Sequence, residues 1–306
     1  MNDLLKLLYK DLPEGANPFG YIPEAPLPGS AVYNRVFDLV GGKVASFDWR
    51  PFAPVRERQY WIPFCVSFSR LNCAETKAKK DSMDINLSDR ELGVISKTTL
   101  SGNSLEAVSE SFRNTGVRLE SLVPFTDRML KYAGDDIWKE IFDLPADNGE
   151  QRYMGGNHSW VYGKPAMIDA MDFSPLQIAV GIGETWEDEG IVKTPKNIGS
   201  YHAVMVLFID ADGYIYIQDS IGKEFKTLEP DYPMTGVKSF RDLPENWKEK
   251  NMPKFFKIDD HGKLGIMVLE GQVGIVLFED KMNDYVTLQQ ITSEKLAAAP
   301  TISIPS

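Results

Sequence analysis

The chain has 306 residues, of which 43% are hydrophobic and 25% are charged, as in ordinary globular proteins. Its formal net charge of −11 argues against a nucleic-acid partner, which requires a basic face, and against binding to an anionic membrane surface. No apolar run approaches the roughly 18 residues that a membrane-spanning helix needs. A chain of this length can form one large α+β domain with extensions, or two modest domains.

The first 46 residues are expected to form an arm. Its start, MNDLLKLLYKDL (1–12), is predicted to be a short amphipathic helix, and it lacks the basic start, long apolar stretch and small-residue cleavage site of a signal peptide. A segment rich in proline and glycine follows, DLPEGANPFGYIPEAPLPGS. Because proline fixes φ and has no backbone N–H, this segment is expected to be extended or turning chain that lies on a surface.

The next part of the chain has a helical pattern. Apolar residues recur at helical spacing in CVSFSRLNCAETKAKK (65–80), and Pro63 just before it is typical of a helix start. A second helix is predicted between Ser104, a good N-cap, and Gly116, a good residue for the position after the C-cap. A shorter helical piece, IWKEIF (137–142), precedes a polar loop.

Strands are predicted from residue 176 onward, in LQIAVGIG, HAVMVLFI and YIYIQD. The motif DADG (210–213) predicts a hairpin turn between the last two, rather than a calcium loop, because no glutamate follows at the required spacing. After residue 250, three short antiparallel strands, a short helix (281–291) and a loosely ordered tail are expected. Three strands with an apolar face need a partner surface, so this part is expected to dock on the sheet domain or to form an assembly contact.

The chain has two cysteines, Cys65 and Cys73, eight residues apart on the first expected helix. Residues so placed on a helix are poorly oriented for a disulfide with each other. The lack of a disulfide framework and of a signal peptide predicts a protein of a reducing compartment, the cytoplasm. A virion-associated location is the alternative, suggested by the short end segments.

Three residues suggest nucleophilic catalysis. Cys65 is expected at the start of a helix, where the helix dipole and a neighbouring imidazolium favour the thiolate. His202 begins one strand of the predicted hairpin and Asp219 ends the other, so that one hairpin presents a base and its orienting carboxylate at the same end. Each residue alone is more often structural, but together they predict a thiol nucleophile with an imidazole base.

Seven blocks of the sequence resemble the papain-like cysteine proteases, in the order of that family. They are FDWR (47–50), QYWIPFCVSFS (59–69), NLSDREL (86–92), GNSLEAV…NTGVRLESLVPF (102–125), PLQIAVGI with GIV (175–192), YHAVMV (201–206) and IQDSIG (217–222). The separation of Cys65 and His202 falls within the roughly 130–150 residues typical of the family. Any one block is weak, but together they are a strong signal over residues 47–225.

The resemblance implies a papain-like two-lobed α+β fold, with a helical left lobe and an antiparallel β right lobe. Its expected parts are an N-terminal arm (1–46), a peptidase domain (47–245), a C-terminal β-rich extension (250–296) and a tail (297–306). The arm is shorter than the helical propeptides common in the family. It could lie in or near the cleft and limit access, but simple packing on the domain is the favoured interpretation.

The resemblance also implies a role for each site residue. Cys65 would attack the scissile carbonyl, and His202 would form the ion pair with it and protonate the leaving amine. The side chain of Gln59 and the backbone N–H of Cys65 would hold the oxyanion. Asp219 would take the place of the family's asparagine and orient the imidazole. The expected substrate-binding residues are Gly102, Asn103 and Tyr201.

The chain departs from the family pattern in ways that indicate a distant branch. Asp219 adds a charge, which raises the pKa of the histidine and extends the ion pair to higher pH. The family tryptophan after the cysteine is replaced by Val66, and the tryptophan that shields the histidine by Ile221. Among the remaining polar residues, WEDE (186–189) is interpreted as a solvated loop. His158 and His261 are interpreted as surface residues, and no metal site is expected.

The sequence therefore predicts a papain-like cysteine endopeptidase that acts on polypeptides through a thioester intermediate, without a cofactor. One alternative is a catalytically idle papain fold that serves as a structural or binding module. The other is a different acyl transfer by the same thiol, such as isopeptide cleavage, deamidation or transglutamination. A narrow or blocked cleft would favour the last alternative, and an open groove that accepts an extended peptide would favour the protease.

Overall fold

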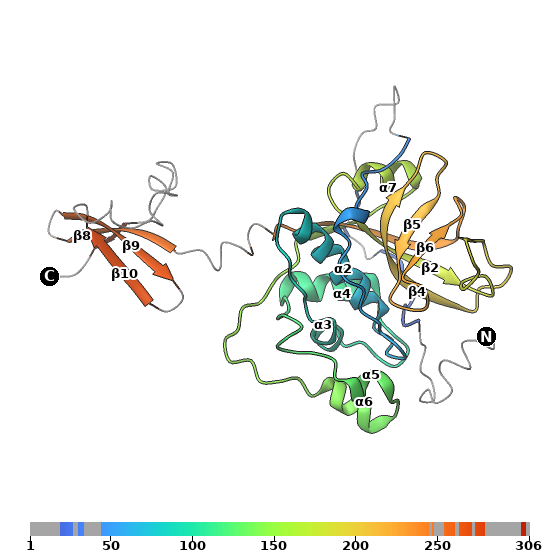
Figure 1. The fold of residues 1–306 in the computed structure, drawn as a ribbon, viewed down its shortest axis with the longest axis horizontal. Coiled ribbons are helices and arrows are strands. Elements are labelled where there is room, and N and C mark those ends of the chain that lie inside the picture. Colours follow the sequence, from blue (N-terminus) through green and yellow to red (C-terminus); the bar gives the residue numbers. More distant parts are fainter. Residues whose placement is uncertain are drawn as a thin grey trace. The chain divides into compact units, whose positions relative to one another are not determined.

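A computed structural model describes residues 19–26, 30–33, 44–244 and 247, together with the backbone of strands between residues 254 and 303. The chain divides into two compact units, Met1–Pro244 and Glu245–Ser306 (Figure 1). The short helices predicted over residues 1–12 and 281–291 lie outside the described residues. In the described part of the chain, none of the helices is both long and apolar enough to cross a membrane.

The first unit begins with helices and continues with strands. Its helical elements are η1 (Arg50–Phe52), α2 (Cys65–Lys80), α3 (Asp89–Ile95), α4 (Leu105–Asn114), α5 (Asp127–Lys131), α6 (Asp135–Phe142) and α7 (Lys164–Ala170). Its strands are β1 (Asn157–Trp160), β2 (Leu176–Ile182), β3 (Ile191–Val192), β4 (Ser200–Ile209), β5 (Ile215–Gln218), β6 (Phe225–Leu228) and β7 (Met234–Arg241). They form one sheet in the order β1-β7-β2-β4-β5-β6-β3, and the predicted α+β class is confirmed.

Helix α2 has the bounds that its sequence pattern predicted. It contacts β2 and β4 of the sheet and also α3 and α4, and Figure 1 shows it between helices α3 to α6 and the strands. Most of its side chains are buried, while basic residues gather in its last turn, where they complement the negative end of the helix dipole. Because α2 is packed on both faces, its first residue, Cys65, is held in a rigid position between the two halves.

The predicted caps of α4 are confirmed. The hydroxyl of Ser104 accepts a hydrogen bond from the N–H of Ala107 at 3.2 Å. Gly116 follows the C-cap and has φ +68°, and a Cβ at this position would lie 2.8 Å from the carbonyl oxygen of Tyr153. Glycine therefore suits both the left-handed conformation and the close approach.

The predicted hairpin is also confirmed, because β4 and β5 pair antiparallel around the DADG turn. The N–H of Gly213 donates to the carbonyl oxygen of Asp210 at 3.0 Å. The Asp210 carboxylate accepts from the N–H groups of Asp212 and Tyr214, at 3.1 and 2.9 Å, and so holds the turn itself. The hairpin brings the beginning of β4 and the end of β5 to the same end of the two paired strands.

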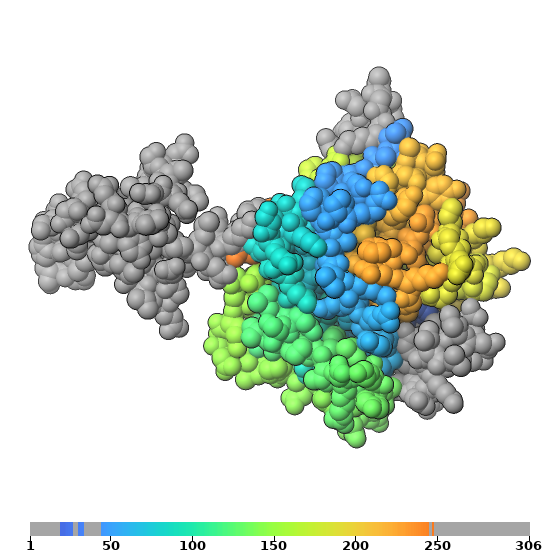
Figure 2. Space-filling model, viewed as in Figure 1, coloured from blue at the N-terminus to red at the C-terminus, as the bar shows by residue number. Residues whose placement is uncertain are grey.

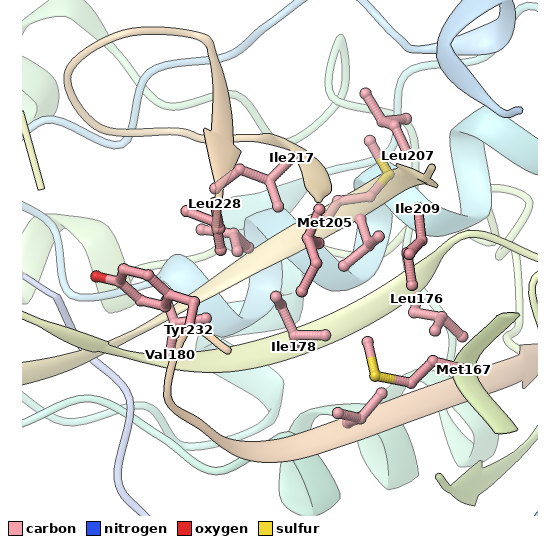
Figure 3. Close-up of a cluster of buried hydrophobic side chains, with 14 of the residues drawn as sticks. Met167, Leu176, Ile178, Val180, Met205, Leu207, Ile209, Ile217, Leu228 and Tyr232 are labelled. Atoms are coloured by element: carbon pink, nitrogen blue, oxygen red, sulfur yellow. The ribbon is translucent and has the colours of Figure 1, made fainter. Parts of the chain in front are cut away.

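Each half of the first unit has its own hydrophobic core. Figure 3 shows the core of the sheet half, where side chains of β2, β4 and β5 gather, among them Ile178, Met205 and Ile217. The core of the helical half consists of Trp61, Ile62, Phe64, Phe68, Met129, Ile137 and Ile141. In the space-filling view, residues that precede α2, in blue, lie between the green helical half and the orange strands (Figure 2). The two cores define two lobes.

The second unit contains β8 (Lys254–Asp260), β9 (Lys263–Glu270), β10 (Val273–Phe278) and β11 (Thr301–Ser303), in the order β10-β9-β8-β11. The three antiparallel strands predicted after residue 250 are β8, β9 and β10. The expectation of a loosely ordered tail is wrong at β11, which pairs parallel with β8. The backbone groups at the free edge of β8 can pair with another strand, and the β-branched residues Thr301 and Ile302 favour that conformation.

Four carboxyl groups lie close together where α2, α3 and the neighbouring loops meet. Asp89, the first residue of α3, is buried, hydrogen-bonds Glu57, and has one carboxyl oxygen without a hydrogen-bond partner. Burial, together with the charges of Glu57 and its neighbours, raises the pKa of Asp89 and of Glu75 well above the usual range. The pKa of Glu120 is raised to about 8 by burial and by Glu57.

These raised pKa values determine how stability depends on pH. A carboxyl group with a raised pKa in the folded protein keeps a proton that the unfolded chain has already lost. Between the unfolded pKa of about 4.5 and the folded pKa of about 8 for Glu120, the folded state therefore binds more protons than the unfolded state. The free energy of unfolding consequently falls as the pH rises through this window.

We expect the first unit to melt at a higher temperature at about pH 5.5 than at about pH 8, with Asp89→Asn reducing the difference by raising the melting temperature at pH 8. Tryptophan fluorescence during heating measures this effect. The control is Asp136→Asn, which changes an exposed carboxylate and should leave the difference as it is. An Asp89→Asn variant that melts lower by the same amount at every pH would contradict the prediction.

Candidate active site

Cys65 is the first residue of α2, and its side chain is fully buried. Its thiol donates a hydrogen bond to the backbone carbonyl of Phe19, which belongs to the N-terminal arm. Cys73, two turns further along α2, is also a buried thiol. Burial raises the pKa of Cys73 well above its usual range, so this residue stays a thiol and packs as a small apolar side chain.

His202 lies on β4 and is fully buried. Its Nε2 is 2.7 Å from Oδ1 of Asp219, which directly follows β5. Its Nδ1 is 3.3 Å from the carbonyl oxygen of Phe19, the same oxygen that accepts the Cys65 thiol hydrogen bond. The structure therefore brings together the thiol, the imidazole and the carboxylate that the sequence singled out.

The charges of this group oppose the effect of burial. Burial alone would lower the pKa of His202, but the charge of Asp219 and then that of Cys65 raise it to about 10. Burial alone would raise the pKa of Asp219, but Lys226 and then His202 lower it to about 2. The imidazole is therefore protonated and the carboxylate ionised at neutral pH, which is the arrangement that stabilises a thiolate nearby.

Gln59 is buried in the segment before α2 and is tied to both halves of the site. Its amide nitrogen donates to the carbonyl oxygen of Ile62 at 2.8 Å. Its amide oxygen accepts from the hydroxyl of Ser220 at 2.6 Å, and Ser220 directly follows Asp219. These two bonds fix the amide group beside the segments that carry Cys65 and Asp219.

The arm runs through the site, between the residues that the sequence predicted to bind substrate. The N–H of Asn103 donates to the carbonyl oxygen of Gly20, and the N–H of Ile22 donates to that of Asn103, both at 2.8 Å. On the other side, Gly20 forms an antiparallel bridge with His202. Residues 19–22 thus lie as a short strand between the two lobes, parallel to the segment of Asn103.

The close fit of this strand depends on two glycines. A Cβ on Gly20, whose φ is +62°, would lie 2.3 Å from the carbonyl oxygen of Pro63. A Cβ on Gly102 would lie 1.9 Å from the carbonyl oxygen of Gly20. The next arm residue, Tyr21, is 2% exposed, and its ring meets that of Tyr201 edge to face, with the centroids 6.4 Å apart.

The favoured interpretation that the arm merely packs on the domain is therefore wrong for residues 19–22. The reason is local, because glycine allows the backbone to approach α2 and Asn103 closely enough for both to form hydrogen bonds with it. Further along, the arm is held by Glu24, whose carboxylate accepts from the N–H of Glu106 in the first turn of α4, at 2.8 Å.

Two residues of the site escaped the sequence analysis. Trp186 is 2% exposed, so WEDE is not simply a solvated loop. Its indole stands edge to face over His202, with the ring centroids 5.9 Å apart. Trp186 therefore covers the histidine that lost its shielding tryptophan where Ile221 stands. Lys226 donates to Oδ2 of Asp219 at 2.5 Å. In β6 the lysine is buried while Phe225 is exposed, a reversal of the usual pattern that could have drawn attention to it.

The interpretation of His158 as a surface residue is also wrong, because pairing of β1 with β7 buries it beside Lys238. Its Nε2 is 2.9 Å from a Glu110 oxygen, and its Nδ1 is 3.0 Å from the Lys238 ammonium. Burial and then Lys238 lower the pKa of His158 to about 4.

Glu106, Glu110 and His158 could together approach a metal ion, but the Lys238 ammonium already pairs with Glu106 and contacts the imidazole. His261 lies outside the described residues.

Comparisons with known proteins identify the fold. No family model and no curated protein matches the sequence. Among solved structures, xylellain, a cysteine protease from Xylella fastidiosa, has a TM-score of 0.56 at 14% identity over 74% of this chain and 96% of its own. Digestive procathepsin L2 from Tenebrio molitor has a TM-score of 0.57 at 17% identity, covering 75% and 79%. The protease and lectin-like domains of Cwp84 from Clostridium difficile give 0.55 at 16% identity, covering 78% and 58%. The chain therefore has the papain-like fold of cysteine proteases, as predicted.

Proposed function

We propose that this protein is a cysteine peptidase that hydrolyses peptide bonds through Cys65 and His202, oriented by Asp219, and that residues 19–22 keep it latent. The observation that carries the proposal is the convergence of thiol, imidazole and carboxylate between the two lobes of a papain-like fold, with a peptide segment already lying across them. The same three groups in this order are what thiol-based acyl transfer requires.

The geometry supports one chemical role for each group in this proposal. Because Nε2 of His202 is engaged by Asp219, Nδ1 is the nitrogen that faces the thiol. The Cys65 thiolate attacks the substrate carbonyl carbon, a C–S bond forms, and Nδ1–H gives its proton to the leaving amine as the C–N bond breaks. Water then attacks the thioester carbonyl carbon while His202 takes a proton from it, the C–S bond breaks, the acid product leaves, and the thiolate–imidazolium pair is restored.

The oxyanion of each tetrahedral intermediate needs hydrogen-bond donors. The N–H of Cys65 is suited to this role, because an N–H in the first turn of a helix is not used by the helix itself. The amide of Gln59 is the second donor in this proposal, and its position is set by Ile62 and Ser220.

The arm supports a peptide substrate rather than another acyl acceptor. The cleft is blocked, but it is blocked by an extended segment of the chain's own backbone, which hydrogen-bonds to Asn103 as a substrate strand would. The Cys65 thiol faces the carbonyl oxygen of Phe19 and donates to it, whereas cleavage requires approach to the carbonyl carbon. The segment therefore occupies the site without presenting a scissile bond in reactive geometry.

The test uses the full chain with Gly20→Leu, which prevents the arm from seating, and a heat-denatured protein as substrate. We expect cleavage by this variant, loss of at least about 1,000-fold when Cys65→Ala is added, and unchanged cleavage when Cys73→Ala is added instead. Mass spectrometry of the products measures the rate. Equal cleavage with and without Cys65 would refute the peptidase assignment. Alkylation of Cys65 without any cleavage would favour a different acyl transfer.

A further inference from the structure

Lys226 is a lysine in an unusual place. Its side chain is only 2% exposed, at the point where β6 leaves the turn after Asp219. Burial of an ammonium group costs several kcal/mol unless the charge is paired and its hydrogen atoms find acceptors. Here the ammonium donates to Asp219 and, at 3.1 and 3.3 Å, to the carbonyl oxygens of Ile221 and Lys223.

The Asp219 carboxylate is shared between two cationic partners. Its Oδ1 accepts from Nε2 of His202 at 2.7 Å and from the N–H of Ile221 at 2.9 Å. Its Oδ2 faces Lys226 at 2.5 Å. Each oxygen therefore has a fixed set of donors, which prevents the carboxylate from rotating away from the imidazole.

Trp186 covers this arrangement. Its indole stands over the imidazole of His202 and also over the Lys226 ammonium, which is 4.8 Å from the ring centroid. A cation beneath an aromatic face in a water-poor site gains from the ring quadrupole. The two cations around Asp219 are thus held under one aromatic cover.

Other charged groups around the pair come from several elements. Glu187 is 3.3 Å from the Lys226 ammonium and is partly exposed. Arg56, from the segment before α2, interacts with Asp219 and with Glu224. The Cys65 thiol faces His202 from α2. Among the described residues, the two cations in direct contact with the Asp219 carboxylate are His202 and Lys226.

We propose that Lys226 is a positioning residue of the thiol site, which neutralises Asp219 and thereby sets the pH range over which Cys65 and His202 remain an ion pair. The inference rests on the proposed thiol chemistry. A carboxylate alone beside the imidazole would bring an uncompensated buried charge. The pair of Asp219 and Lys226 is neutral overall, as the side chain of an asparagine is. The carboxylate still offers an oxygen to Nε2 of His202.

The sign of the effect follows from electrostatics. A positive charge lowers the pKa of every neighbouring acid, whether thiol or imidazolium. Removing Lys226 should raise both the pH at which the Cys65 thiolate forms and the pH at which the His202 imidazolium loses its proton. Removing the negative charge of Asp219 should shift both pKa values the other way.

The test measures the pH dependence of the reaction of Cys65 with iodoacetamide, in the full chain carrying Gly20→Leu. The rate should rise in two steps, one for each pKa of the pair. We expect Lys226→Met to move both steps to higher pH by about one unit or more. We expect the double variant Lys226→Met with Asp219→Asn to bring both steps back to within about half a unit of the starting profile.

Matched variants complete the experiment. Lys79→Met removes a half-buried lysine that donates to the carbonyl oxygen of Ala53 at 2.9 Å, away from the site, and should move neither step. If Lys226→Met does not fold, the double variant compared with Asp219→Asn alone reports the same loss of the lysine, and it should again lie at higher pH.

The outcomes separate this inference from the proposed function. Unmoved steps after loss of Lys226, or a shift that Asp219→Asn does not reverse, would overturn the positioning role, even if the rate falls. Because alkylation reports the ion pair and not peptide cleavage, the predicted shifts in a variant that cleaves no peptide would sustain this inference while the peptidase proposal failed.

Discussion

Replacement of Gly20 by leucine is expected to raise the rate at which iodoacetamide modifies Cys65 in the full chain by at least about 30-fold. The leucine Cβ would lie 2.3 Å from the carbonyl oxygen of Pro63, and Gly20 has φ +62°. Overpacking costs about 1–3 kcal/mol, and a left-handed conformation costs another ~1–2 kcal/mol for a residue with a Cβ. Because roughly 1.4 kcal/mol changes an equilibrium tenfold, the seated arm should become correspondingly less populated.

Intact-mass spectrometry measures this labelling, and the protein supplies its own internal reference. Cys73 is buried, and its pKa is raised well above the usual range, so a single adduct is expected. The control is Gly149→Leu, because Gly149 also has a positive φ, +87°, but a Cβ there meets nothing within 4 Å. If Gly149→Leu accelerates labelling as much, or if Cys65 stays protected in Gly20→Leu, the arm is not what covers the thiol.

Replacement of Asp242 by asparagine is expected to lower the free energy of unfolding of the first unit by about 3–5 kcal/mol. Asp242 follows β7 and forms two hydrogen bonds with Arg70 of α2, at 2.9 and 2.7 Å, and both side chains are essentially inaccessible. It also accepts from the N–H of Gly156 at 2.7 Å. Loss of the carboxylate would leave the Arg70 charge buried and unpaired, although the ring of Phe240 lies 3.7 Å from it.

Urea unfolding followed by tryptophan fluorescence measures this loss. A solvent-exposed ion pair of an arginine and an aspartate provides the control. Asp48 and Arg50 are bonded at 2.8 Å, with side chains 40% and 45% exposed, so Asp48→Asn should change the free energy of unfolding by less than about 1 kcal/mol. If the two variants lose similar free energies of unfolding, burial is not what makes the pair of Arg70 and Asp242 stabilising.

Local pattern was enough to predict the elements that carry the proposed catalytic groups. The bounds of α2, the caps Ser104 and Gly116, and the turn at Asp210–Gly213 depend on residues close together in sequence. The order of motifs around Cys65 and His202 then indicated a papain-like fold, although the sequence is at most 17% identical to xylellain, procathepsin L2 and Cwp84. A short turn also determines which strand ends meet, and for this reason the proximity of His202 and Asp219 could be expected.

The surroundings of the site could not be read in the same way. Trp186 and Lys226 look like solvated residues in their own segments, and only the packing of the segment between β2 and β3 against β4 and β6 places the indole over both cations. The burial of His158 arises when β1 pairs with β7, two strands far apart in sequence.

The sequence by itself thus determined the class of fold, the helix that begins with Cys65, and the hairpin that joins His202 to Asp219. Only the tertiary structure decided that Gly20 lies against Pro63, just before α2, and that a lysine pairs with the Asp219 carboxylate. The physical reason is that caps, turns and periodicity are set by neighbouring residues. Closure of a cleft and pairing of buried charges depend instead on distances between segments that the chain brings together only when it folds.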